Sequence, residues 1–213
     1  MNNVIFFGDS ICFGQAVSPH KTWVTRLSKL IDEHSDGEFA VINTSINGNT
    51  TRMALERMPH DVQSHKMKII LIQFGMNDCN YWVTDGGVER VSPPAFKANI
   101  NEIINRARKF GAEKIILNTN HPTTRTENWN HVPLSYEESN KRYSEIIREI
   151  SNEDPGTVLV DIRKAWENEI KKTDLKDMLL SDQLHLSEKG HELYYDTLKN
   201  TFISIIEDYR RKN

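Results

Sequence analysis

The run Met67–Phe74 is almost continuously apolar over the length of a single strand. A strand that covers only one face of a sheet alternates apolar and polar residues, whereas a continuous apolar run is typical of a strand buried on both faces. Such strands occur in parallel sheets, whose neighbouring strands are joined by helical crossovers on the two faces. This run therefore predicts an α/β fold in which strands and helices alternate.

Strand and helix patterns do alternate along the chain. Further short apolar runs predict strands at 4–7, 39–43, 114–118 and 157–161. Apolar residues at helical spacing predict helices over 20–34, 94–110, 135–151, 162–172 and from 187 onward. A shorter helix is expected after the polar turn at 44–51, interrupted at Pro59 and His60. We expect a single domain over residues 1–213, a three-layer α/β/α sandwich with a mostly parallel five-stranded sheet.

Length and charge exclude several classes of function. A chain of 213 residues can bury one full hydrophobic core. The 27 Lys and Arg residues against 30 Asp and Glu give a formal net charge of −3, which offers no electrostatic attraction to nucleic acid. No apolar stretch approaches the roughly 20 residues that span a bilayer, and Met1–Asn3 lacks the basic start of a signal peptide. We therefore expect a cytoplasmic protein with no nucleic-acid partner and no membrane span.

The sequence contains no pattern that calls for a cofactor. The two cysteines, Cys12 and Cys79, are too few for a disulfide framework and are interpreted as small packing residues. No set of His, Cys and Asp has metal-ligand spacing, so no metal is expected. A Walker A loop and a G-x-G-x-x-G fingerprint are both absent, which argues against nucleotide binding.

Reactive side chains follow the predicted strands at several points. Sheets of this kind bind ligands at the carboxyl ends of their strands. Ser10 follows the first strand directly, Gly48 lies in the turn after the second, and Asn77 follows the third. Asp182 and His185 stand three residues apart shortly before the last helix. One edge of the sheet is therefore expected to gather a hydroxyl, a glycine turn, an amide and an Asp–His pair.

These residue types are the parts that a serine nucleophile needs. A hydroxyl at neutral pH requires a base, and His185 can serve as that base for Ser10. Asp182 can fix the tautomer of the imidazole and stabilise the imidazolium. A developing oxyanion requires donors, which the backbone N–H groups of Ser10 and Gly48 and the side-chain amide of Asn77 could supply.

At this point the sequence resembles the SGNH hydrolases, also called GDSL esterases/lipases. The resemblance rests on four segments in the family's order: Gly8-Asp9-Ser10-Ile11, Ile46-Asn47-Gly48-Asn49-Thr50, Gly75-Met76-Asn77-Asp78 and Asp182-Gln183-Leu184-His185. It implies a flavodoxin-like sandwich without metal or organic cofactor. It also implies that Ser10 is the nucleophile, that Asp182 and His185 complete the triad, and that Gly48 and Asn77 complete the oxyanion hole with Ser10.

The chain departs from the family pattern at two positions. Ile11 stands where the family name has Leu, a conservative apolar change. Met76 stands before Asn77, where a small or hydroxylated residue is common, so Met76 is expected to narrow or reshape the pocket. Asp9 and Asp78 are interpreted as structural residues that hold their turns by side-chain hydrogen bonds.

Two long loops, 79–94 and 119–133, are candidates for substrate contact because loops of this length in a compact domain are usually functional or mobile. Their aromatic residues either form a wall for an acyl or sugar group or pin the loops to the core: Tyr81, Trp82 and Trp129. Their histidines either touch substrate or are ordinary loop residues: His121 and His131. His191, on the last helix, is expected to pack or to lie on the surface.

The expected function is that of a serine esterase that cleaves a small, short-acyl ester through an acyl-enzyme on Ser10. An O-acetyl group on a carbohydrate or small metabolite fits the polar loops. One alternative is an acyltransferase that uses the same serine with an alcohol in place of water. A second, from a different class, is a flavodoxin-like binding module without hydrolase activity.

Overall fold

The sheet is five-stranded and parallel throughout, with the strand order β2-β1-β3-β4-β5. The computed structural model describes residues 2–128, 132 and 134–212. The strands are β1 (Asn2–Gly8), β2 (Phe39–Asn43), β3 (Met67–Gln73), β4 (Lys114–Asn118) and β5 (Thr157–Val160). The order 2-1-3-4-5 is that of flavodoxin-like folds, which confirms the predicted architecture.

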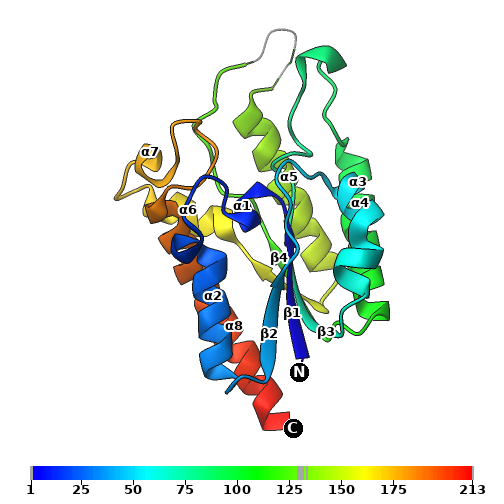
Figure 1. The fold of residues 1–213 in the computed structure, drawn as a ribbon. Coiled ribbons are helices and arrows are strands. Elements are labelled where there is room, and N and C mark those ends of the chain that lie inside the picture. Colours follow the sequence, from blue (N-terminus) through cyan, green and yellow to red (C-terminus); the bar gives the residue numbers. More distant parts are fainter. Residues whose placement is uncertain (1, 129–131, 133, 213) are drawn as a thin grey trace.

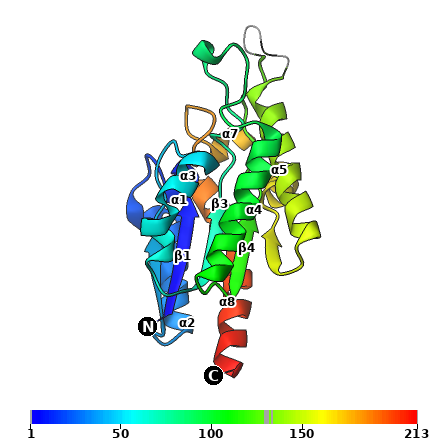
Figure 2. The ribbon, with the colours of Figure 1, turned by 90° about the vertical axis from the view of Figure 1, so that its right-hand side faces the viewer.

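Helices cover both faces of the sheet. In Figures 1 and 2, α2 and α8 pack together on one face, and α3, α4 and α5 lie on the other. The helices are α1 (Ser10–Phe13), α2 (Trp23–His34), α3 (Thr51–Met58), α4 (Pro93–Lys109), α5 (Tyr136–Glu153), α6 (Ile162–Glu169), α7 (Leu175–Met178) and α8 (Glu188–Lys212). Short 3₁₀ turns occupy η1 (Pro19–Lys21) and η3 (Val83–Asp85). The predicted three-layer sandwich is therefore confirmed.

The strand order reverses between β1 and β3. From β1 the chain crosses to β2 on one side, and then returns past β1 to β3 on the other. Gly8, the last residue of β1, is in register with Gln73, the last residue of β3. Ligands in open α/β sheets bind where the order reverses, outside the carboxyl ends of the strands. The segments that carry Ser10 and Asn77 leave the sheet at this point.

Aromatic packing joins β1 to the helices that cover it. Phe6 lies 5.7 Å, ring centroid to ring centroid, from both Trp23 on α2 and Phe202 on α8. Trp23 in turn stacks on Tyr194 at 4.8 Å. The indole Nε1 of Trp23 donates a 2.9 Å hydrogen bond to the carbonyl oxygen of Ile11. This cluster therefore anchors the segment directly after β1 to two helices that lie far apart in sequence.

The helix boundaries differ from the predictions at three places. The α-helix α3 ends at Met58, directly before Pro59, as predicted, but the chain then continues as an unpredicted π-helical turn, η2 (Pro59–Gln63). Proline has no backbone N–H, and the wider turn lets the chain continue to coil after the α-helix ends. The helices α1 and α7, four residues each, were not predicted because they are too short to show periodicity.

Gly190, in the first turn of α8, allows that helix to approach the segment that ends at Met178. A Cβ at this position would collide with the Met178 carbonyl oxygen and lie 3.1 Å from Cη2 of Trp166. The N–H of Ser187 donates to the same Met178 oxygen at 3.0 Å. The close packing therefore holds the start of α8 against the segment that carries Asp182 and His185.

We predict that Gly190→Ala lowers the free energy of unfolding by about 3 kcal/mol, the upper end for overpacking, because the struck atom belongs to the backbone. Urea denaturation followed by circular dichroism measures this loss. The matched control is Gly86→Ala, where a Cβ meets nothing within 4 Å and only the positive φ of +60° is penalised, at about 1 kcal/mol. Equal losses in the two variants would contradict the packing argument.

Candidate active site

Ser10, His185 and Asp182 form a continuous hydrogen-bonded chain. The Ser10 Oγ lies 2.9 Å from Nε2 of His185, and Nδ1 of His185 lies 2.5 Å from Oδ2 of Asp182. The carboxylate accepts hydrogen bonds, so Nδ1 carries the proton and Nε2 is free to accept the serine hydroxyl. The structure therefore brings together the three side chains that sequence reasoning selected, in the geometry of a nucleophile, a base and an orienting acid.

Ser10 is held at the junction of β1 and α1. Asp9 precedes it in an extended conformation, and Oδ1 of Asp9 accepts a 3.0 Å hydrogen bond from the Ile11 N–H. The α1 helix ends at Gly14, which has a φ of +83°. Ser10 is 4% exposed, so protein covers almost all of its surface.

A compact turn explains the three-residue spacing of Asp182 and His185. The second carboxylate oxygen of Asp182 accepts the backbone N–H groups of Leu184 at 3.0 Å and of His185 at 2.9 Å. Gln183 adopts a φ of +65° between them, a conformation that is uncommon for a residue with a side chain. One carboxylate therefore both folds the turn and orients the imidazole.

Asp182 is stabilised in its ionised form. Partial burial alone would raise its pKa, but the hydrogen bonds from the His185 side chain and from the backbone N–H groups outweigh burial, and the pKa lies below its ordinary value of 3.8. A carboxylate that stays ionised can stabilise a positive charge on the neighbouring imidazole.

His121 contacts this turn from the interior of the protein and does not face solvent. The structure corrects the expectation of a substrate contact, because His121 is fully buried and its Nε2 lies 2.8 Å from the Leu184 carbonyl oxygen. Burial lowers the pKa of His121 to about 3, so the ring is neutral and Nε2 must carry the proton that the carbonyl accepts. Trp166 packs against the same ring at 4.9 Å.

Gly48 and Asn77 lie in the segments that leave β2 and β3. Gly48 has a φ of +75°, and a Cβ built there would meet no atom within 4 Å, so the peptide is open to a ligand. Neither the Ser10 N–H nor the Gly48 N–H donates to a protein acceptor among the described residues. Nδ2 of Asn77 donates to Oδ2 of Asp9 at 3.3 Å, which leaves its second N–H for a ligand. These three groups are the donors proposed from the sequence.

Arg57 joins the end of β1 to the segment that follows β2, near Ser10 and Gly48. Its side chain donates to the carbonyl oxygen of Gly8 at 3.2 Å and to Oδ1 of Asn49 at 2.7 Å. Its guanidinium also lies over the ring of Phe7, 4.5 Å from the centroid. Sequence reasoning missed this role because an arginine on a helix carries no local signal of the carbonyls it meets.

Two buried carboxyl groups hold turns, as predicted. Oδ1 of Asp78 accepts the backbone N–H of Thr51 at 2.9 Å and its hydroxyl at 2.5 Å, which ties the start of α3 to the segment after β3. Burial raises the pKa of Asp78 to about 6 and that of Asp9 to about 7. The expectation that His191 packs is also confirmed: it is buried, and its Nδ1 accepts the Trp23 N–H at 3.2 Å.

The remaining residues that the sequence proposed as substrate contacts differ in their exposure to solvent. Met76 and Tyr81 are 2% and 4% exposed, so both pack inward and present little surface to a substrate. Trp82 is 51% exposed, with the Arg90 guanidinium 4.6 Å from its ring centroid. Trp129 and His131 lie outside the described residues.

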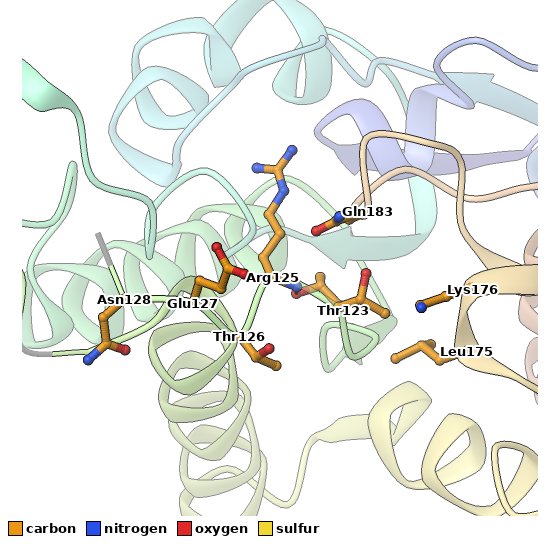
Figure 3. A pocket seen from close by; sticks show the side chains of 9 residues that line it. Thr123, Arg125, Thr126, Glu127, Asn128, Leu175, Lys176 and Gln183 are labelled. Atoms are coloured by element: carbon orange, nitrogen blue, oxygen red, sulfur yellow. The ribbon is translucent and has the colours of Figure 1, made fainter. Parts of the chain in front are cut away.

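A polar cavity of about 810 Å³ borders the Asp182–His185 turn. Figure 3 shows its lining side chains, which come from the 123–128 segment on one side and from Leu175, Lys176 and Gln183 on the other. Most of them are hydroxyl, amide or charged groups. Arg125 links the cavity to the turn, since its Nε and Nη2 donate to the Asp182 carbonyl oxygen at 3.1 and 2.8 Å.

Both cysteines are buried free thiols whose pKa values burial raises, so neither is an ionised nucleophile. Within residues 2–128, 132 and 134–212, no group of three or more His, Cys, Asp or Glu side chains is placed to hold a metal ion. In the same part of the chain, no helix has the length and apolar character of a membrane span.

A family model described as the GDSL-like Lipase/Acylhydrolase family matches residues 6–193, a range that includes every candidate site residue named above. The chain belongs to this family. As a member of the GDSL family it is a carboxylic ester hydrolase, and the family membership agrees with the strand order and with the segments from which it was predicted.

Individual relatives have low sequence identity to this chain, but the similarity covers most of it. An isoamyl acetate-hydrolyzing esterase of Saccharomyces cerevisiae is 25% identical over 98% of this chain and 89% of its own length. An arylesterase of Vibrio mimicus is 27% identical over 69% of this chain and 62% of its own length. Among solved structures, an acetylxylan esterase from Geobacillus stearothermophilus superposes with a TM-score of 0.77 at 21% identity, over 94% of each chain, and so shares the fold.

The raised pKa of Asp9 predicts a specific pH dependence of stability. The folded-state pKa of about 7 exceeds the ordinary value of 3.8, so the folded protein keeps a proton that the unfolded chain releases between about pH 4 and 7. The stabilising effect of this proton is complete below pH 4 and is lost as the pH rises to about 7.

We therefore predict that Asp9→Asn becomes more stable relative to wild type as the pH rises from 4.5 to 7.5, by at most about 1.4 kcal/mol per pH unit. Urea midpoints at several pH values measure the difference, and its slope separates titration from any constant cost of the substitution. Parallel pH profiles of the two proteins would show that Asp9 is ionised throughout.

Proposed function

We propose that this GDSL-family protein is a serine esterase that transfers a short acyl group to Ser10 and then to water. The observation that carries the proposal is the Ser10–His185–Asp182 hydrogen-bonded chain, with contacts of 2.9 and 2.5 Å. The N–H groups of Ser10 and Gly48, which have no protein acceptor among the described residues, and the Asn77 amide are the proposed donors for an oxyanion.

In the first half-reaction, Nε2 of His185 takes the proton of the Ser10 hydroxyl as Oγ attacks the ester carbonyl carbon. The carbonyl oxygen becomes an oxyanion and is stabilised by the donors of Ser10, Gly48 and Asn77. His185 then gives its proton to the leaving alcohol, and the acyl group remains on Oγ. In the second half-reaction His185 takes a proton from water as the water oxygen attacks the acyl carbon. The bond between the acyl carbon and Oγ then breaks, the carboxylic acid leaves, and His185 returns the proton to Oγ of Ser10.

The cavity supports a polar alcohol as the leaving group. A long acyl chain gains affinity from apolar walls, but Leu175 is the one aliphatic side chain among the described residues that line this space. The hydroxyl, amide and charged groups instead match the donors and acceptors of a hydroxyl-rich molecule. Two similar proteins, the yeast enzyme and the acetylxylan esterase, are named for acetate esters, which supports an O-acetyl substrate.

We predict that a fluorophosphonate probe labels the wild-type protein and that Ser10→Ala abolishes labelling and lowers nitrophenyl acetate hydrolysis by at least about 10³-fold. Mass spectrometry of the labelled peptide and a steady-state assay measure the two effects. Ser18→Ala, an exposed serine in the same loop region, is the matched control and keeps both activities. A folded wild-type protein that remains unlabelled, or equal labelling of the Ser10→Ala variant, would overturn the proposal.

The role of the cavity gives a separate prediction. Thr126→Trp fills part of it and should lower kcat/KM for acetylated xylo-oligosaccharides by about 10-fold, equivalent to about 1.4 kcal/mol, with less than about 2-fold change for nitrophenyl acetate. Ser204→Trp, at an exposed site on α8, is the control for adding a surface indole. Equal loss for both substrates would mean that the cavity does not receive the alcohol.

A further inference from the structure

The guanidinium of Arg90 connects two of the proposed oxyanion donors. Its Nη1 and Nη2 donate to the Gly48 carbonyl oxygen at 3.4 and 3.3 Å. Nη1 also donates to Oδ1 of Asn77 at 3.4 Å. One side chain, from the loop between β3 and α4, therefore contacts the segments that follow both β2 and β3.

The amide of Asn77 lies between a guanidinium and a carboxyl group. Its oxygen faces the cation of Arg90, and its nitrogen faces the Oδ2 of Asp9 at 3.3 Å. The reverse orientation would place the amide N–H groups against the guanidinium, which is repulsive. Arg90 therefore fixes which end of the amide is available to a ligand.

Arg90 restrains Gly48 in a different way. Gly48 has a φ of +75° and no side chain, so its peptide units have wide conformational freedom. The two contacts to its carbonyl oxygen hold the Gly48–Asn49 peptide and limit rotation about the bond that joins the Gly48 Cα to that carbonyl. The proposed donor is the N–H on the other side of the same Cα, so Arg90 restrains the turn that presents this donor. An amide held in place before the reaction stabilises an oxyanion more than one that must reorganise.

Arg90 is itself held by contacts outside the proposed oxyanion hole. Its backbone N–H donates to the Asn80 carbonyl oxygen at 2.9 Å, and its guanidinium stacks on Trp82. In the part of the chain that the structure describes, no Asp or Glu oxygen lies within ion-pair distance of it. Its partial burial lowers its pKa from 12.5, while the nearby charge of Asp78 opposes that shift, and an arginine remains charged at neutral pH.

We propose that Arg90 is a positioning residue for the oxyanion hole: it orients the Asn77 amide, restrains the turn at Gly48 through the Gly48 carbonyl and, through its charge, makes the Asn77 N–H a stronger donor. This inference rests on the proposed function of Ser10. Because the oxyanion exists only after attack on the carbonyl, Arg90 should affect kcat much more than KM. Loss of a residue that merely supports the loop would not lower kcat selectively over KM.

The test compares Arg90→Met, which keeps an unbranched stem but removes the guanidinium and its charge, with Arg90→Lys, which keeps the charge without the planar fork. The control is Arg142→Met. Arg142 lies on α5, is half exposed, and pairs at 3.7 Å with Glu89, which is on the same loop as Arg90. Steady-state hydrolysis of nitrophenyl acetate, the rate of fluorophosphonate labelling and thermal unfolding are measured for each variant.

We expect Arg90→Met to lower kcat by about 10- to 100-fold, less than the loss of a complete oxyanion donor, with KM changed less than about 2-fold. Labelling of Ser10 should slow in parallel, Arg90→Lys should retain an intermediate rate, and added guanidinium ion should partly restore Arg90→Met. Arg142→Met should match wild type in all three measurements.

A double-mutant cycle with Asn77→Ala keeps the inference testable if Arg90→Met is less stable. If Arg90 acts through Asn77, the kcat cost of Arg90→Met is smaller in the Asn77→Ala background than in wild type. Additive costs, a loss confined to KM, or a kcat within 2-fold of wild type would each overturn the positioning role. An unlabelled, inactive wild type would instead overturn the proposed function, so the two failures are distinct.

Discussion

The pairing of β1 with β3 is the constraint on which the rest of the structure depends. Both strands are buried on both faces, and their last residues, Gly8 and Gln73, are in register. Two chain segments therefore leave the sheet at the same height, one with Ser10 and the other with Asn77. The position of the candidate nucleophile Ser10 relative to Asn77, its proposed oxyanion donor, is consequently set by backbone hydrogen bonds of the central sheet, which are among the least deformable parts of a domain.

Charged side chains hold the loops of the candidate site in place at the edge of the sheet. Asp182 shapes the turn that presents His185, Arg57 joins the ends of β1 and β2, and Arg90 lies between Gly48 and Asn77. Each of these groups binds backbone atoms as well as side chains, so each fixes a loop and a reactive group with one contact network. The buried carboxyl of Asp9 belongs to the same network and is the least favourable of these groups to ionise.

The sequence predicts the strands and the candidate catalytic segments because both are local signals. The apolar run at 67–74 defines β3 without reference to any other segment, and Asp182-Gln183-Leu184-His185 contains its own turn. The role of His121 could not be predicted, because it depends on the Leu184 carbonyl, 63 residues away. Arg90 is similar: nothing between residues 79 and 94 indicates that its side chain reaches Gly48. Pro59 is a local signal of the other kind: it marks the end of α3 at Met58, but it does not indicate the π-helical turn that follows.

The hydrogen bond between Ser10 and His185 joins positions 175 residues apart, and the turn that carries His185 is held by the start of α8. Ser10 therefore lies beside His185 only when the segment that follows β5 has folded back against the end of β1. The sheet itself contains neither His185 nor the start of α8, so a change that loosens this packing separates the two side chains while the strands stay paired.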